Sequence, residues 1–233
     1  MIKSIISASA IALALLFSGC ANRDLQGTHS GFLTKYDNLE ENDKLEGDTR
    51  VFITPGSDFT KYENIYVAPV QIISAIPESE WTPEQKILFE KISTYLTTGY
   101  KDALRDGTGY RLTEDKKSPK TIVFEGAISA VAVNHDDMEW YQFTPITLGL
   151  TVAARVTYVN GAVRILGEGR MTDASTGKVL LRAMTLQKGK EVKTAADRLV
   201  FNDVKPALDA WLKRTNKNLL KLRKGIVKYH ANN

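Results

Sequence analysis

The sequence predicts an α+β protein, a two-layer sandwich in which a mostly antiparallel sheet carries helices packed on one face. Three observations support this fold class. Residues 81–109 show a helical spacing of apolar side chains, residues 110–186 show successive strand patterns, and a long amphipathic pattern closes the chain. Strands set between two helices pack most simply as one sheet with the helices against a single face.

Two strand patterns precede the first helix, at residues 50–56 and 62–73. Within the second, the apolar run 65–70 is typical of a central strand. Pro69 is expected near the end of that strand, because proline has no N–H to donate to a strand ladder.

The first helix carries a complete start signal. Thr82 is a candidate N-cap, Pro83 fits the first helical position, and Gln85 completes a capping box. We expect Gly107 to end this helix, because glycine readily adopts the left-handed conformation that closes many helices.

The strand patterns after the first helix are joined by two predicted turns. The patterns cover residues 110–114, 121–134, 148–159, 162–173 and 179–186. Asn160 and Gly161 form the strongest short hairpin signal, since both positions of such a turn need positive φ. In the second turn, residues 173–178, Gly177 is expected in the left-handed position. Consecutive antiparallel strands are the predicted result.

The last helix is expected from about Asp203 to Tyr229, and Pro206 is expected to kink or restart it. Apolar side chains step by four and three residues along one side: Leu208, Leu212, Thr215, Leu219, Leu222 and Ile226. Lysines step in the same way on the opposite side: Lys213, Lys217, Lys221, Lys224 and Lys228. The helix is therefore expected to bury its leucines and to expose a row of lysines, here called the lysine face.

The N-terminus has the parts of a secretory signal peptide. Lys3 is followed by an apolar stretch, Ile5–Phe17, which is shorter than the ~20 residues that a membrane span requires. The small residues Ser18 and Gly19 then precede Cys20, which resembles the lipobox of bacterial lipoprotein precursors. That resemblance implies cleavage between Gly19 and Cys20, a diacylglycerol on the cysteine thiol, and a fatty acyl group such as palmitate on the new amino terminus.

The predicted domain organisation has three parts. Residues 1–19 form a lipoprotein signal peptide, residues 20–49 an acylated N-terminus and tether, and residues 50–233 a single α+β periplasmic domain. The tether is expected to order partly near residues 30–36, and its acidic run is interpreted as a solvated linker.

Lipidation also gives the single cysteine a role. An unpaired cysteine in an exported protein needs an explanation, and the alternative is an ordinary signal peptide with a chance cysteine. By resemblance to enterobacterial lipoproteins, Ala21 after the cysteine implies sorting to the outer membrane. Cys20 is the only cysteine, so the processed chain has none for a disulfide or a catalytic thiolate.

Three segments resemble a family of bacterial lipoproteins known only as domain of unknown function 3313. They are "SGFLTKYDNLE", "PGSDFTKYENIYVAPVQI" and "DASTGKVLLRA", and their order along the chain strengthens the resemblance. The resemblance implies location and fold rather than a mechanism, since the family has no assigned activity.

No catalytic motif stands out in the sequence. It contains no G-x-S-x-G, H-E-x-x-H, G-x-G-x-x-G or P-loop pattern, and it has three histidines. His135 lies in an acidic stretch that we interpret as a polar loop, because ligands on consecutive residues would need a tightly curved loop and no second cluster completes a metal site. Beside it, Trp140 and Tyr141 are a possible ligand patch, although such aromatic residues more often border a core.

Charge is concentrated at the C-terminus. The whole chain has a formal net charge of +4, and from Val204 onward eight Lys or Arg stand against one Asp. A solvated outer face is the default interpretation of the lysine face, and an anionic partner is the functional alternative.

The sequence therefore predicts a non-catalytic lipoprotein of the outer membrane, lipid-anchored and facing the periplasm, that binds or supports another envelope component. The partners expected are the membrane itself, through the anchor, and an envelope protein, lipopolysaccharide or anionic phospholipid. Nucleic acid is excluded by compartment, and no cofactor or metal is expected. A periplasmic enzyme or a small-ligand carrier is the alternative.

Overall fold

The computed structural model describes residues 29–74, 77–134, 160–193 and 199–227. Its elements, in chain order, are β1 (Glu40–Glu41), β2 (Asp48–Ile53), η2 (Phe59–Lys61), β3 (Asn64–Val67), β4 (Gln71–Ile72), η3 (Glu78–Glu80), α1 (Pro83–Gly107), β5 (Arg111–Leu112), β6 (Thr121–Asn134), β7 (Asn160–Asp173), β8 (Val179–Lys193) and α2 (Phe201–Arg223). The predicted α+β fold with a long C-terminal helix is confirmed.

One mixed sheet contains the eight described strands. Its order is β1-β2-β8-β7-β6-β3-β5, and β4 pairs with β6 outside this path. The long central pairs β2–β8, β7–β8 and β6–β7 are antiparallel, whereas β3 and β4 pair with β6 in parallel. The sheet is therefore mostly antiparallel, as predicted. Pro69 follows the end of β3, also as predicted.

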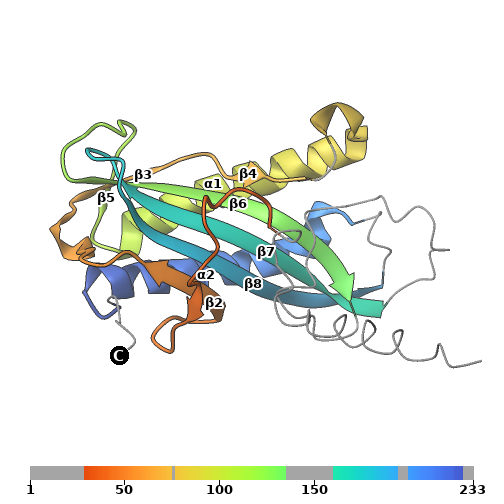
Figure 1. Cartoon of the computed structure of the whole chain (residues 1–233). Helices are drawn as coiled ribbons and strands as arrows, with labels where there is room; N and C mark the ends of the chain where they lie inside the picture. Colours follow the sequence, from red (N-terminus) through yellow and green to blue (C-terminus); the bar gives the residue numbers. More distant parts are fainter. Residues whose placement is uncertain (1–28, 75–76, 135–159, 194–198, 228–233) are drawn as a thin grey trace, which may run out of the picture.

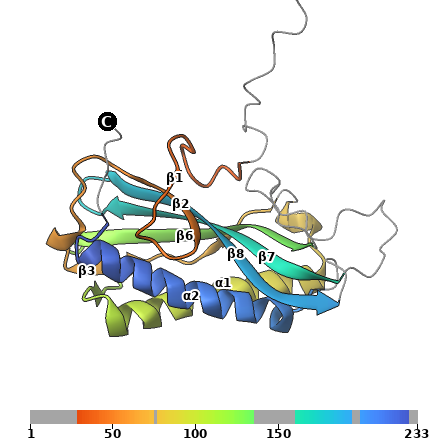
Figure 2. The ribbon, with the colours of Figure 1, turned by 90° about the horizontal axis from the view of Figure 1, so that it is seen from below.

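The two faces of the sheet have different covers. Both α1 and α2 lie side by side across one face, which we call the helix face (Figure 1). Seen from below, the segment leading into β1 and β2 lies on the other side of the sheet (Figure 2). We call that side the opposite face, and we call residues 29–38 the N-terminal segment.

The ends of α1 follow the sequence closely. Thr82 accepts a hydrogen bond from the Gln85 N–H and Gln85 accepts one from the Thr82 N–H, so the predicted capping box is confirmed. The helix ends at Gly107, as predicted, and Thr108 is the C-cap. Gly109 has a φ of +78° and takes the left-handed position instead.

The predicted hairpin at Asn160 and Gly161 is wrong. Both residues lie inside β7, paired with Lys193 and Val192 of β8. The β7–β8 ladder continues past the expected end of its second strand, so the asparagine and glycine extend a strand instead of turning the chain. The second turn is confirmed, because Gly177 has a φ of +71° between β7 and β8.

The last helix is shorter than predicted. It runs from Phe201 to Arg223 and is continuous through Pro206, so the helix does not restart there. Proline at this position costs one backbone hydrogen bond near the first turn, which the packed helix tolerates. Gly225, with a φ of +66°, follows the C-cap, and Ile226 beyond it is exposed rather than part of the apolar side.

Glycines allow α2 to approach the molecule closely. An ideal Cβ built on Gly167 of β7 would lie 1.6 Å from the ring of Trp211, and one on Gly99 of α1 would lie 2.3 Å from Leu212. Trp211 itself is buried. The indole of α2 thus occupies the space that any side chain at Gly167 would need, and this contact fixes the helix on the sheet.

Candidate functional site

The structure places most of the predicted lysine face on the outside of α2. Lys213, Lys217 and Lys224 are exposed and Lys221 is half-buried, whereas Lys228 lies outside the described residues. The side chains that α2 buries against the core are Val204, Ala207, Leu208, Trp211, Leu219 and Leu222. The expected division between apolar and basic sides therefore holds over the helix.

The carboxylate of Glu46 forms ion pairs with two lysines of this face. The Nζ of Lys217 lies 3.0 Å from Glu46 Oε2, and the Nζ of Lys221 lies 3.6 Å from Glu46 Oε1. The Glu46 N–H donates to Asn218 Oδ1 at 2.8 Å, and Asn218 Nδ2 donates back to the Glu46 carbonyl at 3.1 Å. The hydrogen bond from Lys217 lowers the pKa of Glu46. Glu46 is thus part of the folded domain, and its interpretation as solvated linker is wrong.

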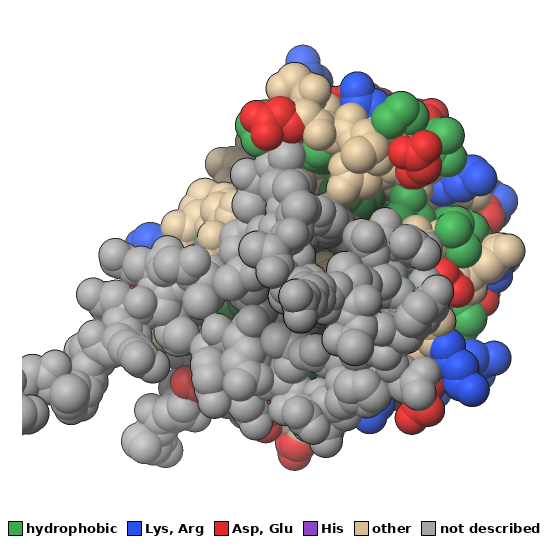
Figure 3. Space-filling model, turned by 90° about the vertical axis from the view of Figure 1, so that its right-hand side faces the viewer, with side chains coloured by type: hydrophobic (Ala, Val, Ile, Leu, Met, Phe, Trp, Pro, Cys, Tyr) green, Lys and Arg blue, Asp and Glu red, His purple; other side chains and the backbone are tan. Residues whose placement is uncertain are grey.

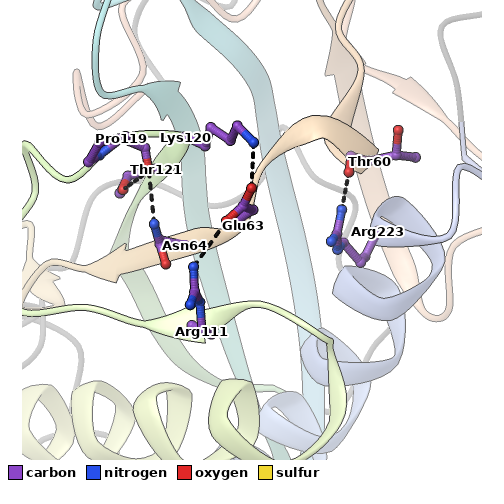
Figure 4. A network of polar contacts seen from close by, with 8 residues as sticks. All are labelled: Thr60, Glu63, Asn64, Arg111, Pro119, Lys120, Thr121 and Arg223. Atoms are coloured by element: carbon purple, nitrogen blue, oxygen red, sulfur yellow. Dashed lines mark hydrogen bonds and ion pairs between the residues drawn. The ribbon is translucent and has the colours of Figure 1, made fainter.

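The C-terminal end of α2 is held by a second polar network (Figure 4). Glu63 pairs with Lys120 at 2.5 Å and with Arg111 at 3.0 Å, and its pKa is lowered mainly by the hydrogen bond from Lys120. Arg223, in the last turn of α2, donates to the backbone carbonyl of Thr60. Glu63 is thus paired with two cations, and Arg223 is bonded to a backbone carbonyl.

The opposite face carries a row of aligned side chains across four strands, here called the arginine row. Cross-strand pairing places Glu125 of β6 beside Arg170 of β7, Arg170 beside Arg182 of β8, and Arg182 beside Phe52 of β2. Arg170 donates two hydrogen bonds to Glu125, at 2.7 and 3.0 Å, and they raise its pKa. Arg182 lies over the Phe52 ring, 4.5 Å from its centroid, and donates to the Lys35 carbonyl.

Next to the arginine row, a buried carboxylate is bonded to the N-terminal segment. The Tyr36 hydroxyl donates to Glu168 Oε2 at 2.7 Å, and Glu168 is only 3% exposed. Burial raises the pKa of Tyr36. The ring of His29 stacks on Tyr36 with centroids 3.8 Å apart, and burial lowers its pKa although Glu168 and Asp37 act in the other direction.

Apolar contacts also fix the N-terminal segment. Phe32 and Leu33 are buried in the main core, and the Arg170 guanidinium lies over the Phe32 ring, 5.3 Å from its centroid. Residues 29–49 thus pack against the domain that we expected to begin at residue 50. The N-terminal segment, which is the first described part of the chain after the predicted lipid anchor, therefore lies on the opposite face of the sheet.

A small cavity lies between α2 and the helix face. It measures about 80 Å³ and is lined by apolar side chains, with Trp211, Tyr100 and Met171 among them. Two of the polar groups that line it, the Thr49 and Thr185 hydroxyls, lie 3.2 Å apart and form a hydrogen bond. We interpret it as a packing gap beside the glycine contacts of α2.

At the end of the molecule where α1 begins, the described residues form no surface patch with charges of one sign only. There, hydrophobic, acidic and basic side chains lie intermixed (Figure 3). Ile87 and Val200 are exposed large hydrophobic side chains. Neither of the two described helices is apolar enough over a spanning length to cross a membrane.

Several predicted residues fall outside the described residues. They are Gly19, Cys20, His135, Trp140 and Tyr141, so lipidation, cleavage and the aromatic ligand patch stay predictions. Within the described ranges, no group of three or more His, Cys, Asp or Glu side chains is arranged to hold a metal ion.

The arginine row and the Tyr36–Glu168 contact were missed by the sequence reasoning. Their signal is the alternation in "LGEGRMT", where glycines on one side of β7 alternate with Glu168 and Arg170 on the other. A charged residue at every second position of a long strand indicates a polar sheet face. The sequence could not indicate that residues 29–38 cover that face.

The protein is thus an α+β domain whose N-terminal segment packs on a polar face of the sheet. A family model described as "Protein of unknown function (DUF3313)" matches residues 28–215. The chain therefore belongs to this family, and the resemblance to a lipoprotein family of unknown function is confirmed. It is 26% identical over 204 residues to the uncharacterized lipoprotein YdcL of Escherichia coli (strain K12), covering 86% of this chain and 90% of that relative.

Solved structures show more distant similarity. The PelC dodecamer from Paraburkholderia phytofirmans matches with a TM-score of 0.41 and 14% identity, covering 76% of this chain and 97% of that one. A DUF4136 family protein from Bacteroides thetaiotaomicron VPI-5482 matches with a TM-score of 0.37 and 15% identity, covering 74% and 96%. Lipoprotein GNA1162 from Neisseria meningitidis matches with a TM-score of 0.35 and 8% identity, covering 66% and 97%.

Proposed function

We propose that this protein is a non-catalytic outer-membrane lipoprotein, anchored through acylated Cys20, whose domain faces the periplasm and binds an anionic component of the cell envelope at the lysine face. The observation that carries the proposal is the charge balance of α2. Four described lysines lie on this face, and the carboxylate paired with them is that of Glu46 alone among the described residues. Lys213 and Lys224 make no ion pair with the described chain.

An anionic surface would complement this excess of positive charge. Phosphate groups of lipopolysaccharide or phospholipid and acidic protein surfaces are all attracted to a lysine cluster, by about 1 kcal/mol per lysine at a charged membrane. The membership of a lipoprotein family and the lipobox-like sequence before Cys20 support a location beside such surfaces.

The anchor is tested by fractionation. Wild-type protein is expected in the outer-membrane fraction of a density gradient, and Cys20→Ser is expected to lose that association because no acyl chain can be attached. Recovery of Cys20→Ser in the outer-membrane fraction at the wild-type level would contradict the anchor.

The lysine face is tested by photo-crosslinking in living cells. A photoreactive residue replaces Lys213, and the matched control replaces Lys178, an exposed lysine in the turn between β7 and β8. A discrete adduct at position 213 that is absent at position 178 would support the proposal, and its mass would distinguish protein from lipid or glycan. Equal adducts at both positions, or none above background, would overturn it.

A further inference from the structure

A second pocket lies on the other side of the sheet from the lysine face. It is open to solvent, measures about 370 Å³, and is formed by the N-terminal segment together with β2 and β8. Its lining includes Thr34, Lys35, Asp37, Phe52, Val179 and Arg182. This volume lies in the ~300–1,000 Å³ range of small-molecule sites.

Arg182 is a buried cation whose charge the described chain leaves unmatched. Only 7% of the residue is exposed. The guanidinium donates to the Lys35 carbonyl and lies over the Phe52 ring, yet no carboxylate of the described residues lies within ion-pair distance of it. Burial accordingly lowers its pKa. A buried charge without a counter-ion is costly, so such a group usually has a partner.

A second arginine beside Arg182 increases the local excess of positive charge. Arg170 lies directly opposite Arg182 across β7 and β8, and like charges at opposed positions destabilise a sheet. Glu125 neutralises Arg170 through two hydrogen bonds. Of these two guanidinium groups, Arg170 is paired with a carboxylate of the described residues and Arg182 is not, so the position beside Arg182 lacks an anion.

Asp37 gives the same pocket a negative group. Its side chain is exposed, and it makes no hydrogen bond or ion pair within the described residues. It acts on Arg182 at longer range, since its charge opposes the lowering of that pKa. The pocket thus presents a cation and an anion that do not neutralise each other by direct contact.

We propose that this pocket binds a small zwitterion with the head group of an α-amino acid. Its carboxylate pairs with Arg182, whose planar guanidinium suits two parallel hydrogen bonds, and its ammonium group lies toward Asp37. Val179 and Phe52 supply apolar lining for a small side chain. This site is separate from the lysine face and goes beyond the envelope partner proposed above.

Calorimetry on the full chain purified in detergent tests the proposal with three probes. They are alanine in both enantiomers, acetate as a carboxylate without the amine, and ethylamine as an amine without the carboxylate. At least one enantiomer of alanine is expected to bind, at least tenfold more tightly than acetate and with no measurable binding of ethylamine.

Two variants assign the binding to the pocket. Arg182→Met is expected to lose alanine binding by at least tenfold. The matched control Arg105→Met removes the same charge from an exposed site on α1, where Arg105 pairs with Asp102, and is expected to leave binding unchanged. Circular dichroism of both variants verifies that they are folded.

Three results would overturn the proposal. They are no alanine binding by the wild type, equal alanine binding by folded Arg182→Met, and acetate binding as tight as alanine binding. The lysine-face proposal does not depend on any of them, because its test is the crosslink at position 213.

Discussion

On the helix face of the sheet, α2 is fixed by shape, with Trp211 packed into the space above Gly167. On the opposite face, the N-terminal segment is fixed by charges and hydrogen bonds, with Tyr36 bonded to Glu168 and the arginine row beneath it. The helix face is mainly apolar, whereas the opposite face combines charged side chains with buried apolar ones such as Phe32 and Leu33. The helix face therefore positions α2 and its lysine face, whereas the opposite face holds the pocket for which we propose a small zwitterion.

The largest expected effect belongs to the helix face. Gly167→Ala places a Cβ 1.6 Å from the Trp211 ring, so α2 must shift on the sheet, and we expect a loss of about 3 kcal/mol in unfolding free energy. Urea unfolding measures it. Gly126→Ala is the matched control, because its Cβ would meet its nearest neighbour at 3.8 Å. Equal losses in the two variants would show that the Trp211 contact does not fix the helix.

The next effect belongs to the opposite face. Tyr36→Phe removes the hydroxyl that donates to the buried Glu168 carboxylate, and we expect a loss of about 2 kcal/mol in unfolding free energy. Tyr66→Phe is the control, since the Tyr66 hydroxyl has no hydrogen bond within the described ranges. If both variants unfold at the same urea concentration, the polar contact does not hold the N-terminal segment.

A pH-dependent effect is expected at the turn between β7 and β8. Burial raises the pKa of Asp173, but hydrogen bonds from Ser175, Tyr62 and Thr176 outweigh it, so the pKa lies below its ordinary value. The carboxylate therefore stabilises the fold above its unfolded pKa of about 3.9, and this contribution is lost as the pH falls toward the folded pKa. Asp173→Asn is expected to be less stable than wild type at pH 7 by about 1 kcal/mol.

Unfolding of both proteins in urea at pH 7, 5 and 3 measures this dependence. The difference between them is expected to persist from pH 7 to pH 5 and to narrow at about pH 3, because Asp173 then takes up a proton in the unfolded chain while it stays ionised in the folded protein. A difference that stays constant down to pH 3 would contradict the assigned role of the carboxylate.

The smallest effect is expected at the lysine face. Glu46 is half-buried at the surface and pairs with Lys217 and Lys221, so Glu46→Gln is expected to change the unfolding midpoint only slightly. Added salt is expected to remove the difference, because surface ion pairs are screened. A midpoint shift that survives high salt would show that this pair is more than a surface contact.

The sequence predicted the helix face better than the opposite face. Helical spacing over residues 83–107 and 201–223, together with the Thr82 cap, needs only local information. The arginine row combines side chains from β2, β6, β7 and β8, and their alignment depends on strand register, which no local pattern fixes. The same dependence explains the error at Asn160 and Gly161, where pairing with β8 overrides a strong turn signal.

The most direct test compares the melting temperatures of two arginine variants from the same row. Arg170→Met leaves the half-buried Glu125 without its partner and is expected to cost about 2 kcal/mol, or roughly 5 °C. Arg182→Met loses the hydrogen bond to the Lys35 carbonyl but also removes a buried charge that the described chain does not pair, so its melting temperature is expected to stay close to that of wild type. A fall in melting temperature as large as that of Arg170→Met would contradict the account, because it would mean that Arg182 stabilises the fold instead of being available to a ligand.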